Sequence, residues 1–425
     1  MKAKLYPLKN MINETSVCVS SFCLHIQIIC ASLANGTTTI KGVINSLDID
    51  TTIEWCKALG ASIKKNNDKL IIKGISQDLS LSQSLFTCGN TSITAKLMLP
   101  ILATLTRPFG IKGNEKLLQE LDQLLPFFEA YGINHYLENQ MVRFECSMKN
   151  CEAEFDGDID IYLSAGILIA LSLFKGPSVF KLRAPVRCEK SYNLILKILK
   201  NFSIDIKHPA TMRYEIVGNQ RFRSCVCNTE IDTLYLSHLS LLSTKLSNEG
   251  KIKITNYKNS KLSNENRLFD FVCENVVLFK KYFPKNTFKR KEFQFHKIEY
   301  SVENSLPFLM VLGVINNQDT LITKIDFSNK RIKRQYKIME SIFSKLKLGY
   351  SYFNNEILIH PSKVSMKKQV DCENDPYVVM AISFLALLSD YPIVIKNADC
   401  IFDINKDFFK DITSYGAKIE FIHDN

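Results

Sequence analysis

The chain has 425 residues, of which 46% are apolar and 23% charged, so disorder is excluded as a description of the whole chain. This length predicts two or three domains. The 54 basic side chains outnumber the 43 acidic ones and give a formal net charge of +11. That balance favours an anionic partner without distinguishing a metabolite from a nucleic acid or a lipid surface.

The 13 cysteines and seven histidines indicate neither a disulfide framework nor a metal site. The cysteines are scattered singly, which is typical of a reducing compartment. Cys225 and Cys227 are too close in sequence to chelate one ion comfortably, and Cys146 and Cys151 lack a second Cys or His pair at zinc-like spacing. We therefore expect a cytoplasmic protein with no metal and no cofactor.

The segment from Thr15 to Ile40 contains no Asp, Glu, Lys or Arg, as a signal peptide or a membrane span would. Polar side chains interrupt it at Ser20, Ser21, His25 and Gln27. Similar apolar segments recur further along the chain, where export cannot explain them. We interpret this segment as a buried helix and expect no membrane association.

A pattern of apolar helix, tight turn, strand, loop, amphipathic helix and second strand recurs six times, at a spacing of roughly seventy residues. A helix that is apolar all round must be enclosed by protein. Three such helices packed together and covered by sheets and striped helices would satisfy that demand. The strand after each apolar helix is predicted to start near Thr38, Phe109, Ser178, Ile252, Leu321 and Ile393.

Six such units predict an α/β (α+β) protein of two domains with three repeats each. The predicted limits are residues 15–226 for the first domain, and 1–14 with 227–425 for the second. We expect the ligand in the cleft between them. In the second repeat the amphipathic helix is predicted across Leu117 to Ala130. In the fourth, which has the weakest pattern, an apolar helix is predicted from Leu236 to Leu246 and another near Leu268 to Phe279.

Several segments, taken in order, carry a resemblance to a known family. The run from Ala31 to Ile63 resembles the family's opening stretch, and Gly89 to Ala103 is similar to its G-N-S-G-T-T-x-R-L-L segment. Further on, Leu306 to Gly313 resembles the segment before the fifth turn, Asp375 to Ala381 resembles D-H-R-M-A-M-A, and Cys400 to Phe409 resembles C-V-x-K-S-F-P-x-F-F. The family is EPSP synthase, the 3-phosphoshikimate 1-carboxyvinyltransferases.

This resemblance implies two domains of three βαβαββ-type units. It also implies transfer of a carboxyvinyl group from phosphoenolpyruvate to the 5-hydroxyl of shikimate 3-phosphate, in the shikimate pathway of aromatic amino acid biosynthesis. Both substrates are multiply anionic, so the site needs lysines and arginines, and groups that exchange protons as the tetrahedral adduct forms and collapses. We expect a monomer whose partners are these two small molecules.

The same resemblance implies a set of substrate-binding residues. The family's K-E-S-D-R falls on residues 330–334, where its outer cations are kept, and the aspartate of D-H-R is also kept. A lysine stands in for the arginine of the G-N segment. The implied residues are Lys330, Arg334, Lys96, Asp375 and Asn90. A purely structural interpretation remains open for four of them: a surface charge for Lys96, a first helical turn for Arg334, a helix cap for Asp375 and a turn for Asn90.

Most other ligand positions of the family carry different residues here. The lysine and arginine of K-S-x-S-x-R become Ser21 and Ile26, and the arginine of R-P-M becomes Glu120. The aspartate expected to accept a proton becomes Asn304, and a neutral amide is a poor base. The other replacements are Asp160, Ile161 and Tyr162 for two serines and a glutamine, Arg331 and Lys333 for two carboxylates, Tyr377 for an arginine and Asp403 for a lysine.

These replacements leave three functions open. The first is a working carboxyvinyltransferase in which other cations, such as Lys190 or Arg183, replace the missing ones. The second is a degenerate homologue that keeps the fold as a binding or partner protein. The third, a nucleic-acid binder, would use a basic and aromatic run, which we interpret as a solvated face. The basic residues of that run are Lys280, Lys281, Lys285, Lys289, Arg290 and Lys291.

Overall fold

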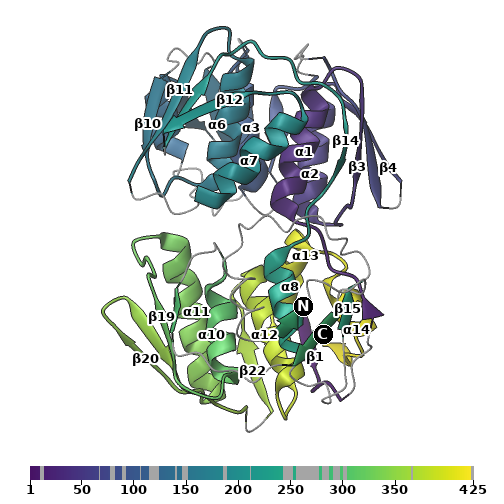
Figure 1. The fold of residues 1–425 in the computed structure, drawn as a ribbon, viewed down its shortest axis with the longest axis vertical. Coiled ribbons are helices and arrows are strands. Elements are labelled where there is room, and N and C mark those ends of the chain that lie inside the picture. Colours follow the sequence, from purple (N-terminus) through teal and green to yellow (C-terminus); the bar gives the residue numbers. More distant parts are fainter. Residues whose placement is uncertain are drawn as a thin grey trace. The chain divides into compact units, whose positions relative to one another are not determined.

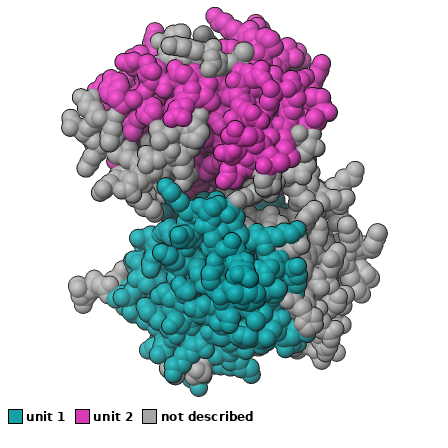
Figure 2. All heavy atoms as spheres, turned by 90° about the vertical axis from the view of Figure 1, so that its left-hand side faces the viewer, with its two compact units in different colours: residues 1–18, 231–425 teal, residues 19–230 magenta. Residues whose placement is uncertain are grey.

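The chain forms two compact units in this computed structural model, one of residues Val19–Glu230 and one of Met1–Cys18 with Ile231–Asn425. Figure 2 draws them in magenta and teal. Each unit is described by itself. The structure describes all residues except 10–13, 67, 77–81, 89–91, 106, 114–123, 139–140, 146–151, 185–188, 211, 243–251, 255–276, 280–286, 291–296, 300–303, 365–366 and 423–425.

The unit Val19–Glu230 contains three four-stranded sheets that share one topology (Figure 1). In the spatial order given next, the first and second strands of each sheet are parallel. The second and third strands are antiparallel, and so are the third and fourth. The strand orders are β14 (Val226–Asn228), β3 (Thr37–Lys41), β5 (Lys69–Lys73), β4 (Ser62–Asn66); β6 (Leu85–Thr87), β7 (Phe109–Lys112), β9 (Met141–Glu145), β8 (Asn134–Glu138); and β10 (Glu152–Asp156), β11 (Ser178–Arg183), β13 (Arg213–Ile216), β12 (Ile206–Ala210).

The core of this unit is built from three nearly charge-free helices: α1 (Ser21–Leu33), α3 (Ile93–Leu102) and α6 (Ile161–Leu173). Nearly every side chain along them is buried, as expected for helices that are apolar on all faces. Striped helices alternate with them along the chain: α2 (Leu47–Ala58), α5 (Leu125–Tyr131) and α7 (Glu189–Asn201). The predicted helix across Leu117 to Ala130 is seen from residue 124 onward, and residues 117–123 lie outside the described part.

Helices α3 and α6 approach each other closely at Gly166. A Cβ atom at this position would lie 2.4 Å from the carbonyl oxygen of Leu97 and 2.9 Å from that of Lys96. Any larger residue would therefore push the two helices apart. This glycine sets the separation at which side chains from the N-terminal ends of the two helices can meet.

The second unit repeats the same plan, again with three four-stranded sheets. Its sheets are β16 (Val277–Phe279), β17 (Thr287–Arg290), β15 (Ile252–Ile254), β2 (Glu14–Thr15); β18 (Lys297–Glu299), β19 (Thr320–Thr323), β21 (Glu356–Ile359), β20 (Tyr350–Phe353); and β22 (Lys368–Asp371), β23 (Ile393–Lys396), β1 (Lys2–Leu5), β24 (Ile419–Ile422). The strands predicted to begin near Thr38, Phe109, Ser178, Ile252, Leu321 and Ile393 start within a residue of those positions. The predicted α/β class is confirmed, with six sheets shared equally by the two units.

Apolar helices again fill the core of this unit: α8 (Thr233–Leu242), α10 (Leu306–Ile315) and α12 (Pro376–Leu388). The other helices among the described residues of this unit are α11 (Lys330–Leu346), the 3₁₀ turn η3 (Ala398–Cys400), α13 (Ile401–Ile404) and α14 (Phe408–Ser414). The predicted helix near Leu268 to Phe279 is wrong at its end, because residues 277–279 form strand β16. A β-branched residue and a phenylalanine there suit a strand paired with β17, and residues 268–276 lie outside the described part.

Two short strands determine where the units begin and end. β14 pairs in parallel with β3, so residues 226–228 belong with the first three repeats. β2 pairs in parallel with β15, so residues 14–15 belong with the last three. The units therefore start and finish a few residues later than the predicted limits of 15 and 226. Pairings between strands so distant in sequence leave no trace in a local repeat pattern.

A partly buried acid in α14 makes the stability of the second unit depend on pH. Burial raises the pKa of Asp411 to about 6, although Asn405 Nδ2 donates a hydrogen bond to its Oδ2 at 3.3 Å. The folded chain thus holds this proton more tightly than the unfolded chain. Stability is gained as pH falls below 6 and lost as pH rises through it.

We expect Asp411→Asn to raise the free energy of unfolding of this unit by ~1–3 kcal/mol at pH 8 and to have little effect at pH 4. Asparagine keeps an oxygen that can accept from Asn405 but carries no charge to desolvate. Urea unfolding of the full chain at the two pH values measures the difference. An equal effect at both would mean that the Asp411 charge is not responsible.

Candidate functional site

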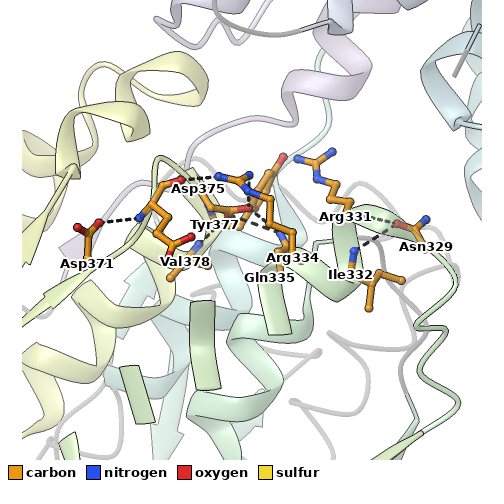
Figure 3. A network of polar contacts seen from close by, with 10 residues as sticks. Asn329, Arg331, Ile332, Arg334, Gln335, Asp371, Asp375, Tyr377 and Val378 are labelled. Atoms are coloured by element: carbon orange, nitrogen blue, oxygen red, sulfur yellow. Dashed lines mark hydrogen bonds and ion pairs between the residues drawn. The ribbon is translucent and has the colours of Figure 1, made fainter. Parts of the chain in front are cut away.

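A polar network in the second unit joins the first turns of α11 to the N-terminus of α12 (Figure 3). Asp375 is the N-cap of α12, and its Oδ1 accepts from the backbone N–H groups of Tyr377 and Val378 at 3.0 and 3.1 Å. Gln335 Nε2 lies 3.4 Å from Asp375 Oδ2, and Arg334 reaches the same oxygen at 3.7 Å. The carboxylate is 3% exposed, so its charge is compensated by these donors and by the helix dipole.

The loop before α12 fixes the other side of Arg334. Glu373 and Asn374 both have positive φ, 46° and 57°, and the N–H of Glu373 donates to Asp371 Oδ1 at 2.9 Å. Asn397 Nδ2 holds the same oxygen at 2.6 Å. The loop thereby presents the carbonyl of Glu373 to Arg334 Nη2, which donates to it. Arg334 is held at two points while 39% of its side chain stays exposed.

Three more cations stand in the first two turns of α11: Lys330 and Lys333, which are exposed, and Arg331. The helix is capped by Asn329, whose Oδ1 accepts from the N–H groups of Arg331 and Ile332. The Cζ atom of Arg331 lies 5.4 Å from the centre of the Tyr377 ring, within the range of a cation–π contact. A concentration of positive charge at a helix N-terminus is unfavourable for the helix itself, so these residues are not explained by helix stability.

Carboxylates lie close to these cations. The pKa of Cys400 is raised well above its usual value, chiefly by burial and then by the nearby charges of Asp375 and Asp403, while Arg334 lowers it. Asp403 in α13, at the position where the family pattern has a lysine, thus acts on the same thiol as Asp375. This thiol is protonated at neutral pH and is not a nucleophile.

In the unit Val19–Glu230, Lys96 is engaged in a buried ion pair. Its Nζ donates to Asp160 Oδ2 at 2.7 Å, and the two side chains are only 8% and 15% exposed. Asp160 is also the N-cap of α6, because its Oδ1 accepts from the N–H groups of Tyr162 and Leu163. The carboxylate of Asp160 therefore pairs with the Lys96 ammonium and also caps the N-terminus of α6. Either of these groups could otherwise bind an anion.

The same unit contains a second polar chain. His25 Nδ1 lies 2.8 Å from Thr52 Oγ1, which lies 2.7 Å from Thr94 Oγ1. All three side chains are buried, and burial lowers the pKa of His25 to about 3. A neutral imidazole of such low basicity cannot supply a positive charge to a substrate near pH 7.

Three other positions taken from the family pattern also lack a charged or basic group. Ser21 is the first residue of α1, and Ile26 is fully buried within it. Asn304 stands two residues before α10 with φ of 63° and is 8% exposed. Asparagine tolerates this left-handed conformation, but its amide cannot accept a proton as a carboxylate does.

The remaining residues named from the sequence belong to other parts of the chain. Asn90 and Glu120 lie outside the described residues, as does the side chain of Lys190. Arg183 pairs with Asp156 at 2.9 Å, and both side chains are largely exposed. Of the basic run, Lys289 and Arg290 belong to strand β17, whereas Lys280, Lys281, Lys285 and Lys291 are not described.

The comparison with known proteins is decisive for the family. A model described as EPSP synthase (3-phosphoshikimate 1-carboxyvinyltransferase) matches residues 13–412. The chain belongs to the EPSP synthase family. A 3-phosphoshikimate 1-carboxyvinyltransferase of Clostridium kluyveri is 24% identical over 406 residues, with 93% of each chain covered. One of Clostridium novyi is 24% identical over 426 residues, with 96% of each covered.

Solved structures share the fold. An EPSP synthase of Acinetobacter baumannii superposes with a TM-score of 0.75 at 15% identity, covering 99% of this chain and 100% of that one. The enolpyruvyl transferase NikO of Streptomyces tendae gives a TM-score of 0.75 at 12% identity, covering 99% and 98%. The resemblance read from the sequence is thus confirmed as family membership.

Two absences hold for the described residues of this EPSP synthase family member. No described helix is long and apolar enough to cross a membrane, and α1, within the segment that resembled a signal peptide, is buried along nearly its whole length. No three His, Cys, Asp or Glu side chains come together among those residues in a way that could hold a metal ion.

Sequence reasoning did not foresee the contact between Arg331 and Tyr377 or the pairing of Lys96 with Asp160. The sequence did contain an indication of the Lys96–Asp160 pair. Two ligand positions of the family carry other residues here, and a carboxylate at position 160 could neutralise the lysine. The indication of the contact between Arg331 and Tyr377 was weaker: an arginine absent from the family pattern stands three residues before the retained Arg334.

Proposed function

We propose that this protein is a 3-phosphoshikimate 1-carboxyvinyltransferase-like enzyme of the shikimate pathway. The observation that carries this proposal is the family match across residues 13–412. Phosphoenolpyruvate would donate the carboxyvinyl group, and the 5-hydroxyl of shikimate 3-phosphate would accept it. A C–O bond forms between that hydroxyl and C2 of phosphoenolpyruvate, and the bond from C2 to the phosphate oxygen breaks with release of inorganic phosphate. We propose a cytoplasmic monomer that needs no cofactor.

Arg334 and Lys330 are the residues of this chain that we assign to anion binding. The guanidinium of Arg334 is oriented by the Glu373 carbonyl and by Asp375, so little side-chain entropy remains to be lost when it binds a carboxylate or a phosphate. Asp375 acts here as a positioning residue. It caps α12 and holds Arg334 in place.

A second candidate function is ligand binding without turnover. The observation that favours it is the Lys96–Asp160 ion pair, which places a carboxylate where an anionic substrate would need a cation. Asn304 supports it further, because it stands where the family pattern expects a proton acceptor. A charged hydrogen bond is worth about 1.5–3 kcal/mol, so the loss of several would remove on the order of 10 kcal/mol of transition-state stabilisation.

Phosphate release separates the two candidates. The purified chain is incubated with phosphoenolpyruvate and shikimate 3-phosphate, its folding is checked by circular dichroism, and inorganic phosphate is measured over time. Steady release supports the transferase. No release, combined with calorimetric binding of phosphoenolpyruvate, supports the binding protein. If no phosphate is released and phosphoenolpyruvate does not bind, both candidate functions are contradicted.

We expect Arg334→Ala to raise the Kd for phosphoenolpyruvate by about 10- to 100-fold, the equivalent of one charged hydrogen bond. Lys345→Ala is the matched control, because Lys345 is an exposed cation in the last turn of the same helix. It should change the Kd by less than about twofold. Equal effects of the two substitutions would indicate that general charge, and not the Arg334 position, attracts the ligand.

A further inference from the structure

The sheet formed by β14, β3, β5 and β4 carries a group of lysines on its outer face. Its inner face packs against α1 and α2, and Figure 1 shows β3 and β4 at the periphery of their unit. Leu70 and Ile72 of β5 are fully buried, so the residues that alternate with them, and those paired with these residues, point outward. Four exposed lysines occupy such outward positions, and we call them the basic face: Lys41, Lys64, Lys69 and Lys73.

The register of the strands places two of these lysines directly opposite each other. Lys41 pairs with Lys69, and the same row continues with Asn228 beside Lys41 and Asn66 beside Lys69. Like charges directly opposite on neighbouring strands are destabilising. The stability of the sheet therefore does not explain the basic face.

Neighbouring carboxylates do not neutralise the basic face. The four strands contain no aspartate or glutamate, and none of the four lysines forms a hydrogen bond or ion pair with a described residue. The sheet of β10, β11, β13 and β12 differs, because three of its cations pair with carboxylates of the same sheet. Those pairs are Lys181 with Glu152, Arg183 with Asp156, and Arg213 with Glu215.

The other polar side chains of the basic face fit a phosphate backbone. Exposed hydroxyl and amide groups lie between and beside the lysines, on Thr37, Ser62, Asn66 and Asn228. Such groups, together with lysine, are the usual hydrogen-bond donors to phosphate oxygens. Lys69 and Lys73 are four residues apart on β5, a span of roughly 13 Å, and a nucleic-acid duplex presents roughly eight negative charges over that length.

The apolar residues of this face argue against a protein or lipid partner. Ile71 and Val226 are 39% and 68% exposed, but Thr39 stands between them in the register, so they form no continuous apolar patch. Protein interfaces are enriched in aromatic residues and depleted in lysine. The four strands contain no aromatic residue to stack on a base and no arginine to read a base edge.

We propose that the basic face binds the phosphate backbone of a nucleic-acid duplex without reading its sequence. This function is separate from carboxyvinyl transfer, because it uses none of the residues assigned to substrate binding. It also gives a location to part of the excess positive charge of the chain.

Fluorescence anisotropy of the full chain with a labelled DNA duplex tests the proposal, at potassium chloride concentrations from about 50 to about 200 mM. Contacts from four lysines give a slope of log K against log salt of about −3.6, so we expect the Kd to rise about 150-fold over this range. Combining Lys41→Gln with Lys69→Gln should change the slope to about −1.8 and raise the Kd at the lowest salt at least about tenfold. Circular dichroism confirms that the variant is folded, as expected when two opposed like charges are removed.

Two single substitutions serve as controls. Lys181→Gln removes a lysine of β11 that is already paired with Glu152, and Lys289→Gln removes a lysine of β17 that belongs to the basic run of the second unit. Each should change the Kd by less than about twofold, because neither contributes an unpaired charge to the basic face. Loss of binding in Lys289→Gln, with the combined Lys41 and Lys69 variant unaffected, would place the contact elsewhere and overturn the proposal.

The remaining outcomes decide the class of partner. A second duplex of unrelated sequence should bind with a Kd within about threefold, because backbone contacts carry no sequence information. A preference above about tenfold would contradict a backbone contact. Absence of duplex binding at the lowest salt, or an unchanged slope in the combined variant, overturns the proposal. Binding of phosphatidylserine vesicles that requires Lys41 and Lys69, without binding of the duplex, would identify a lipid surface and overturn it as well.

Discussion

Replacing Asp160 by alanine lowers the free energy of unfolding of the unit Val19–Glu230 by about 3–5 kcal/mol, the cost typical of breaking a buried ion pair. The substitution removes the carboxylate that Lys96 Nζ contacts at 2.7 Å, and Lys96 itself is only 6% exposed. It also removes the acceptor that caps the N–H groups of Tyr162 and Leu163, which by itself is worth about 1 kcal/mol. Urea unfolding followed by circular dichroism measures the loss.

Two further substitutions separate the charge from the cap. Asp160→Asn keeps a capping oxygen but lacks the negative charge. We expect it to lower the free energy of unfolding by most of the amount that Asp160→Ala does. Lys96→Met leaves Asp160 with its two backbone donors and should cost less, about 1–3 kcal/mol. A loss below about 1 kcal/mol for both Asp160 substitutions would mean that water solvates the lysine well enough without the carboxylate.

The fold was predictable because its pattern is local and repeated. Each apolar helix is recognised from a nearly charge-free run, and the strand that follows it from a short turn and β-branched residues, as in the run from Gly36 to Ile40. The pairings of β14 with β3 and of β2 with β15 could not be predicted in this way. Strand pairing is decided by hydrogen bonds across space, and a strand of two or three residues carries too little pattern to identify its partner.

The candidate site was predictable in its positions and not in its contacts. The motif at residues 330–334 and Asp375 pointed to the starts of α11 and α12, where the structure shows one network. Lys96 and Asp160 were each noted from the sequence, but their pairing depends on how closely α3 approaches α6 at Gly166. A substitution pattern gives residue types, whereas charge compensation depends on distances of a few ångströms.

Acidification destabilises the unit Val19–Glu230 through His25, and we expect a loss of about 2–3 kcal/mol between pH 6.5 and pH 4.5. Burial lowers the pKa of His25 to about 3, so the folded unit does not take up the proton that the unfolded chain binds below about pH 6.5. The contribution is fully present above pH 6.5 and is lost as pH falls toward 3. Unfolding curves at pH 7, 5.5 and 4.5 measure it.

The second unit has its own buried histidine, and an acid of the same unit has the opposite pH dependence. Burial lowers the pKa of His238 to about 4, although its Nδ1 is hydrogen-bonded to the Leu234 carbonyl at 2.9 Å. Asp411, whose pKa is raised to about 6, gains stability over the same pH range in which His238 loses it. The second unit should therefore change less with pH than the unit Val19–Glu230, so the latter should unfold first on acidification.

His25→Leu tests the cause directly. Leucine cannot titrate, and Thr52 and Thr94 keep the hydrogen bond to each other at 2.7 Å, so the variant should lose the acid dependence of its unit even if it is less stable at pH 7. His238→Leu serves as the matched control, because it alters the other unit and should leave this slope unchanged. If the unit Val19–Glu230 stays equally acid-sensitive without His25, the destabilising proton binds elsewhere. Asp160, which is ion-paired with Lys96, would then be the next residue to replace.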